Sequence, residues 1–224
     1  MSALQLAIVL APTALQLLWL RRVGAIRGRA RQAAHVLVYG AASAVAAGAI
    51  EALAQPLLGL ALPEGTVAWH AARCMLCIAL VEELCKLLAA RRGVGRRGMG
   101  TLPCCVLAAM GFDLAENLVY STTATLAVSV VRALTSIARH VLCGAIMGTM
   151  LERAESARSP GGEATAWRMA SVAAPTAVHG LYDLCLYTLP PSIAAVFALS
   201  YGVAGTVAAV VLARGELGRH ASRR

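Results

Sequence analysis

The chain has 224 residues, of which 59% are hydrophobic and only 14% are charged, and its mean hydropathy is +0.70. Soluble domains usually carry about 25% charged residues, so this composition excludes an ordinary soluble globular protein. The formal net charge of +9 would suit a nucleic-acid ligand only if the basic residues formed a patch, and their distribution along the chain argues against that.

Apolar stretches long enough to span a bilayer recur along the whole chain. A transmembrane helix needs roughly 20 mostly apolar residues, and we expect about seven such spans. They lie at approximately 3–20, 33–55, 67–90, 102–124, 128–150, 168–189 and 192–213. The first span lacks a basic n-region, so we expect it to be retained as a helix. The sequence predicts an all-α, multi-pass helix bundle in the cell membrane, with one membrane-embedded domain over 1–224.

Basic residues are concentrated in alternate connections between these spans. Sixteen of the 20 Lys and Arg residues fall in four groups: Arg21, Arg22, Arg27, Arg29 and Arg31; Arg91, Arg92, Arg96 and Arg97; Arg153, Arg158 and Arg168; and Arg214, Arg219, Arg223 and Arg224. The connections near 56–66, 121–127 and 189–191 hold none. Under the positive-inside rule, this predicts an N-terminus outside and a C-terminus in the cytoplasm. The positive charge therefore indicates topology and the lipid bilayer as partner, with no nucleic acid.

The third span contains the sequence LVEELCKLLAA at 80–90, which includes the only lysine of the chain. A charge at the bilayer centre costs about 2.5–3.5 kcal/mol, so such residues usually pair or face a cavity. Glu82 and Lys86 have i,i+4 spacing, and Glu83 and Lys86 have i,i+3 spacing. Residues at these spacings share one face of a helix. We therefore expect one polar stripe on an otherwise apolar helix.

The next three spans carry similar polar stripes. The pairs at i,i+4 spacing are Phe112 and Glu116, His140 and Gly144, and His179 and Asp183. Gly144 is expected to leave a gap beside the imidazole of His140. Turning all four stripes inward would remove most of the cost of burying these groups.

The combined set suits hydrolysis by an activated water. A carboxylate can act as the base, and imidazoles can bind a metal or stabilise an oxyanion. We expect the side chains of Glu82, Glu83, Glu116, His140 and His179 to lie within about 10 Å of each other, because they must reach one water. Cys143 lies near His140 along the helix, which leaves a thiol nucleophile open.

Four motifs, in order on successive spans, carry a family resemblance. EELCK at 82–86 resembles the E-E-x-x-K motif of the PrsW-type intramembrane proteases, and FDLAEN at 112–117 resembles their F-x-x-x-E-N segment. The stretch from Arg132 to Gly148 is similar to the family's arginine–spacer–His–x–x–x–Gly span, and HGLYD at 179–183 is similar to H-x-x-x-D. The motif-bearing core is 67–189. The type II CAAX prenyl proteases are related, but they typically have an arginine where Lys86 stands and a histidine in the second motif.

The resemblance implies an intramembrane endopeptidase acting on membrane-anchored proteins, typically an anti-sigma factor. It implies that Glu82 activates water, that Glu83 pairs with Lys86, with the two glutamates able to exchange roles, and that Glu116 orients the water. His140 and His179 would bind metal or stabilise the oxyanion, supported by Asn117, Asp183 and Phe112.

Metal dependence stays open at this point. His140, His179 and Glu116 would make a zinc set with an open position, whereas the CAAX relatives resemble metal-independent glutamate hydrolases. Two other functions also remain. A proton- or ion-coupled transporter would use similar buried groups, although no inverted repeat is visible. An inactive, protease-like membrane scaffold would keep the fold without the chemistry.

Overall fold

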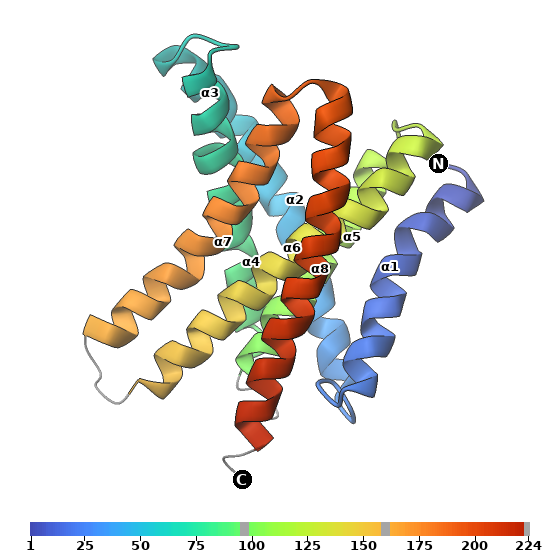
Figure 1. Ribbon diagram of the computed structural model, residues 1–224, viewed down its shortest axis with the longest axis vertical. Helices are drawn as coiled ribbons and strands as arrows, with labels where there is room; N and C mark the ends of the chain where they lie inside the picture. The colour runs from blue at the N-terminus through green and yellow to red at the C-terminus, as the bar shows by residue number, and fades with distance from the viewer. Residues whose placement is uncertain (95–98, 158–161, 222–224) are drawn as a thin grey trace.

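The computed structural model describes residues 1–94, 99–157 and 162–221, with side chains described as far as Val211. Within this part all elements are helices, as predicted, and no strand is present. They are α1 (Ala3–Arg22), α2 (Ala30–Ala61), α3 (Val67–Ala72), the π-helix η1 (Arg73–Ala79), α4 (Leu80–Arg91), α5 (Thr101–Tyr120), α6 (Leu126–Ser156), α7 (Gly162–Thr188) and α8 (Pro191–Ala221) (Figure 1).

Each predicted span corresponds to one helix or to one continuous helical run. The third span consists of three consecutive elements, α3, η1 and α4. Five helices of the described chain are long and apolar enough to cross a membrane: α1, α2, α5, α6 and the Pro191–Val211 part of α8. An all-helical fold with several helices able to cross a membrane is thus confirmed, while the count of seven crossings stays a prediction.

The connections alternate between two ends of the bundle. Figure 1 shows the connection between α1 and α2 at the same end as the C-terminus, and the connections α5–α6 and α7–α8 at the end of the N-terminus. This alternation suits the predicted topology, whose orientation in the membrane stays a prediction. Of the basic residues used for it, Arg96, Arg97, Arg158, Arg223 and Arg224 lie outside the described residues, as do the side chains of Arg214 and Arg219.

Helix α5 is the centre of the bundle. Its residues from Thr101 through Asp113 are all buried, and it packs between α2 and α6. Small residues allow the helices to approach closely, as is typical of packing in lipid. A Cβ atom added to Gly40 of α2 would collide with the carbonyl oxygen of Ala108, and one added to Gly111 of α5 would collide with that of Leu37.

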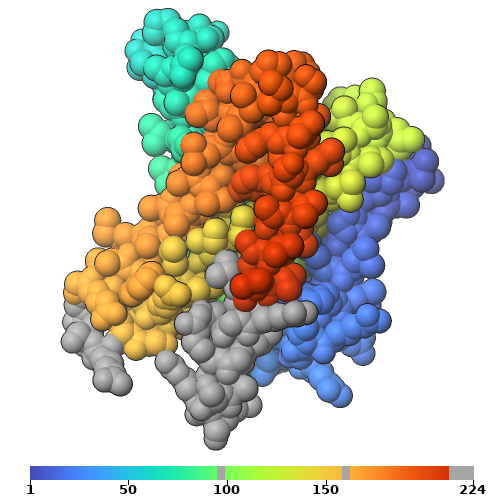
Figure 2. All heavy atoms as spheres, in the orientation of Figure 1, coloured from blue at the N-terminus to red at the C-terminus, as the bar shows by residue number. Residues whose placement is uncertain are grey.

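Helix α6 contacts α5 in the same way. A Cβ atom on Gly144 would lie 2.8 Å from the carbonyl oxygen of Cys105. The expected gap beside His140 is therefore wrong, because the backbone of α5 fills the space that Gly144 leaves. Helices α7 and α8 cover the face of the bundle that Figure 2 displays, in orange and red.

The π-helix η1 joins α3 to the charged helix α4. It spans seven residues and contains the buried, free cysteines Cys74 and Cys77. Gly180 of α7 packs against Met75 and the carbonyl of Cys74, which brings α7 close to this segment. Single π-helical turns occur frequently at functional sites, and this one lies directly before Glu82.

Candidate active site

Helix α4 presents the paired glutamates and the lysine as one buried cluster. The ammonium of Lys86 lies 3.1 Å from Oε2 of Glu82 and 2.8 Å from Oε1 of Glu83. Lys86 is 1% exposed, and its Nζ also lies 4.4 Å from the ring centre of Phe112 in α5. One cation thus holds two neighbouring carboxylates on the face that α4 turns towards the bundle.

His179 connects α7 to this cluster. Its Nδ1 lies 2.9 Å from Oε1 of Glu83, and its Nε2 lies 3.8 Å from Oε2 of Glu82 and 3.3 Å from Oδ2 of Asp183. Since an imidazole nitrogen beside a carboxylate acts as the donor, Nδ1 is assigned the proton. Nε2 then carries the lone pair and accepts a hydrogen bond from NH1 of Arg139.

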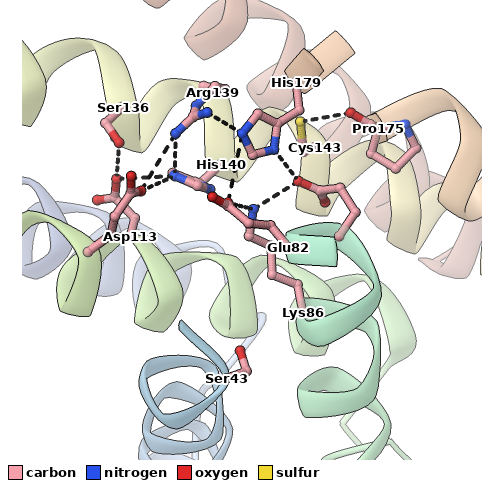
Figure 3. Close-up of polar contacts among 12 residues, drawn as sticks. Ser43, Glu82, Lys86, Asp113, Ser136, Arg139, His140, Cys143, Pro175 and His179 are labelled. Atoms are coloured by element: carbon pink, nitrogen blue, oxygen red, sulfur yellow. Dashed lines mark hydrogen bonds and ion pairs between the residues drawn. The ribbon is translucent and has the colours of Figure 1, made fainter. Parts of the chain in front are cut away.

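His140 of α6 lies next to Glu116 of α5. Its Nε2 is 2.9 Å from Oε2 of Glu116 and 3.8 Å from Oδ1 of Asp113. The rings of His140 and His179 meet edge to face, with centroids 5.6 Å apart. All five residues predicted to be catalytic therefore belong to one connected polar network, drawn in part in Figure 3.

Arg139 occupies the middle of this network (Figure 3). Its NH1 lies 2.8 Å from Oδ1 of Asp183 and contacts Nε2 of His179. Its NH2 lies 2.8 Å from Nε2 of His140 and 3.6 Å from Oε2 of Glu116. Arg139 was not among the residues predicted for the site. Its position directly before His140 in the middle of a span was the signal for a larger role.

Further polar side chains hold Glu116 and Asp113 in place. Asp113 accepts hydrogen bonds from Ser136, at 2.6 Å, and from Nδ2 of Asn117, at 2.9 Å. Arg132 donates from Nε to Oδ1 of Asn117, at 3.1 Å, and from NH2 to Oε1 of Glu116, at 3.0 Å. Asn117 therefore joins Asp113 to Arg132 beside Glu116, and its supporting role stays a prediction.

A cavity of about 760 Å³ opens above these groups. Its charged lining residues are Glu51, Arg73, Glu82, Glu116, Arg132, Arg139 and Asp183. Glu82 lines the cavity and Glu83 does not, because the carboxylate of Glu83 is fully buried between Lys86 and His179. Of the two adjacent glutamates, only Glu82 is placed to meet a water molecule that enters from the cavity.

The thiol alternative is not favoured by this geometry. Cys143 directs its Sγ towards the carbonyl oxygen of Pro175 in α7, at 3.6 Å. Its side chain is fully buried and does not line the cavity. The structure therefore points the thiol away from the space in which a substrate would lie.

Three side chains have the geometry of a metal site. One donor atom each from Glu82, Glu116 and His140 lies within 4.8 Å of the other two. Two carboxylates and one imidazole are a donor set that suits a divalent cation such as Zn²⁺, so the residues fit a metal. Glu82 takes the place in this group that the sequence assigned to His179, and the ligand set His140, His179 and Glu116 stays a prediction.

Comparison with known proteins gives one match. A family model described as PrsW family intramembrane metalloprotease matches residues 28–213. No curated protein matches the chain, and no solved structure does. The match covers α2 through most of α8, and so all the residues of the site.

Proposed function

Because the chain belongs to the PrsW family of intramembrane metalloproteases, we propose that it hydrolyses peptide bonds of membrane-anchored proteins with a water molecule activated by Glu82. The observation that carries this proposal is the convergence of Glu82, Glu116 and His140, with donor atoms within 4.8 Å of one another. Two of the three, Glu82 and Glu116, line the cavity. An anti-sigma factor is the proposed substrate class, and the prokaryotic cell membrane is the proposed location, with the domain extending over 1–224.

The proposed reaction uses Glu82 twice. Its carboxylate takes a proton from water while the water oxygen bonds to the scissile carbonyl carbon and the carbonyl oxygen becomes negatively charged. When this intermediate collapses, the C–N bond breaks, and Glu82 returns the proton to the leaving amine. The products are a carboxyl terminus and a free amino terminus, so no other reactant is consumed.

The surrounding groups position the reaction. Lys86 holds the carboxylate of Glu82 in place, and Glu83 fixes the ring of His179 through Nδ1. Arg139 lines the cavity, and we assign its guanidinium the stabilisation of the oxyanion. A divalent metal held by Glu82, Glu116 and His140 would, when bound, act as a Lewis acid towards the carbonyl.

The transporter and scaffold alternatives fit less well. Membership of a protease family does not favour ion transport. An inactive scaffold would not need buried carboxylates beside a large cavity, because each buried charge lowers stability. The buried ion pairs on their own would also suit a purely structural role. The experiment below separates these possibilities.

The test is cleavage of a quenched fluorescent transmembrane peptide by the purified protein in liposomes. Glu82→Gln should reduce the rate at least about a hundredfold, the usual scale for an acid–base group. Glu163→Gln changes an exposed glutamate at the start of α7 and should leave the rate unchanged. Unchanged turnover in Glu82→Gln would refute the proposal, and a pH-dependent ion flux without cleavage would favour the transporter. Trapping with Glu82→Gln in native membranes would then identify the substrate.

A further inference from the structure

Arg73 is a cation of the cavity wall that has no acidic partner among the described residues. The other arginines of the wall are paired: Arg132 with Glu116, and Arg139 with Asp183 and Glu116. The ion pairs of the described chain include none with Arg73. Glu51 lines the same cavity but forms no salt bridge with it. An unpaired charge within a membrane protein is costly and usually has a functional reason.

The side chain of Arg73 is held in place by three neighbours. Its Nε donates to Oε1 of Gln55 in α2, at 3.2 Å. Its guanidinium carbon lies 4.5 Å from the ring centre of Tyr187 in α7 and 5.5 Å from that of Trp69 in α3. Aromatic faces attract a guanidinium and order it. The group is therefore positioned by α2, α3 and α7, the elements that surround this part of the cavity.

Both terminal nitrogens of Arg73 remain available. The structure gives Arg73 one hydrogen bond, which Nε donates. NH1 and NH2 make no hydrogen bond to a described residue, and they are not among the buried atoms without a partner. Both are therefore accessible. Two parallel N–H groups match the two oxygens of a carboxylate. Because Arg73 lines the cavity of Glu82, an anionic group that binds it would belong to a molecule in that cavity.

We propose that Arg73 is a specificity-determining residue that binds an acidic side chain of the substrate. This inference rests on the proposed proteolytic function. It assigns the substrate a carboxylate near the scissile bond and assigns Arg73 no part in the chemistry.

The position of Arg73 also sets the spacing of that carboxylate. Arg73 lies nine residues before Glu82 in one helical run. At the α-helical rise they would lie about 13 Å apart along the axis, which is an upper limit because the π-helix over Arg73–Ala79 rises less per residue. An extended peptide advances about 3.3–3.6 Å per residue, so the acidic side chain should lie at most roughly four residues from the scissile bond.

The test uses matched peptides in the liposome cleavage assay. Single glutamates, and glutamines as their neutral counterparts, are placed two to six residues from the cleavage site on either side. The wild-type protein should cleave the glutamate peptide with about tenfold higher kcat/KM at one position, mainly through a lower KM, because a charge-assisted bidentate contact is lost with glutamine. No preference at any scanned position would overturn the proposal.

Variants of Arg73 test whether this residue causes the preference for glutamate over glutamine peptides. Arg73→Gln should remove it, and Arg73→Lys should keep part of it, since lysine retains the charge but not the paired donors. Arg91→Gln removes an exposed arginine at the far end of the same helical run and should keep the preference in full. A preference that persists in Arg73→Gln would contradict the assignment. If Arg73→Gln does not fold, cleavage of the glutamate and glutamine peptides by the wild-type and Arg73→Lys proteins still tests the proposal.

Two further measurements separate other outcomes. The assay is repeated in phosphatidylcholine liposomes with and without phosphatidylglycerol. Cleavage rates that depend on the anionic lipid instead of the peptide charge, and that lose this dependence in Arg73→Gln, would assign Arg73 to a lipid phosphate. That result would overturn the substrate assignment.

If the wild-type protein cleaves no peptide, the proposed function fails. Binding of the glutamate and glutamine peptides to the wild-type and Arg73→Gln proteins, measured by fluorescence anisotropy, then still tests the contact with Arg73.

Discussion

His179 and Glu83 form a buried imidazole–carboxylate pair, with Nδ1 of the histidine 2.9 Å from Oε1 of the glutamate. Both side chains are 0% exposed, and the pair joins α7 to α4 beneath the cavity. The glutamate that holds the histidine is therefore not the one that lines the cavity. This separation of roles between Glu82 and Glu83 leads to the predictions that follow.

Lys86 pairs with both glutamates, so its removal should be costly. Removing one partner of a buried ion pair costs about 3–5 kcal/mol, because the other charge is left unpaired. We expect Lys86→Met to lower the free energy of unfolding by about this amount, measured by thermal or denaturant unfolding in detergent. The double variant Lys86→Met with Glu83→Gln should recover part of the loss. A Lys86→Met protein as stable as the wild type would contradict the pairing.

The metal site predicts which side chains control metal content. His140→Ala should weaken Zn²⁺ binding at least about tenfold. Losing a residue that only orients a metal ligand already lowers metal affinity by about 10–100-fold, and His140 is itself a proposed ligand. His35→Ala, an exposed histidine of α2, is the control and should keep the metal. Elemental analysis and equilibrium dialysis measure the effect without any cleavage assay.

The same measurement separates the two ligand sets. If His179→Ala reduces metal content as strongly as His140→Ala does, the set predicted from the sequence is favoured over the one with Glu82. Full turnover after exhaustive chelation, with no metal in the protein, would instead favour a metal-independent glutamate hydrolase.

Arg139 should affect turnover more than substrate binding. It contacts Asp183, Glu116 and both imidazoles, and removing a stabiliser of the oxyanion typically lowers kcat by about a hundredfold or more. We expect Arg139→Met to lower kcat on this scale with little change in KM, and Arg139→Lys to restore part of it. Arg91→Met serves as the control. A purely structural role would lower stability in Arg139→Met while the folded fraction kept its kcat.

The contact between α2 and α5 makes a prediction about stability. Gly40→Ala places a methyl group against the carbonyl of Ala108, and overpacking of this kind costs about 1–3 kcal/mol. Gly48→Ala, on the same helix, has no neighbour within 4 Å and should leave stability unchanged or slightly raised, since alanine favours a helix over glycine. Unfolding in detergent compares the two, and equal stability would contradict the close packing.

Most of the fold was visible in the sequence, because span length and hydropathy are properties of single helices. The seven apolar segments coincide with helices or helical runs, and spacing within one helix placed Glu82, Glu83 and Lys86 together. The π-helix at Arg73–Ala79 was not predicted, since no residue type in that segment requires a wider turn.

The relations between helices were harder to predict. Spacing within α6 says that Arg139 and His140 are adjacent, but not that α7 brings His179 and Asp183 to the same guanidinium. Gly144 appeared to leave space beside His140, whereas its position against Cys105 depends on how α5 is rotated. Glu51, which was not among the residues predicted for the site, lines the cavity of Glu82. Each of these depends on helix rotation and register, which packing of the whole bundle decides.

The direct backbone contacts of Gly40 with Ala108 and of Gly111 with Leu37 have a consequence for how a substrate is positioned. Helices α2 and α5 cannot slide along each other without first moving apart, so Gln55 on one keeps a constant height relative to Glu116 on the other. A polypeptide that enters the cavity therefore meets a frame of fixed dimensions. For the proposed proteolysis, we expect the cut position to depend on the number of residues between the substrate's own anchoring contact and the reacting bond.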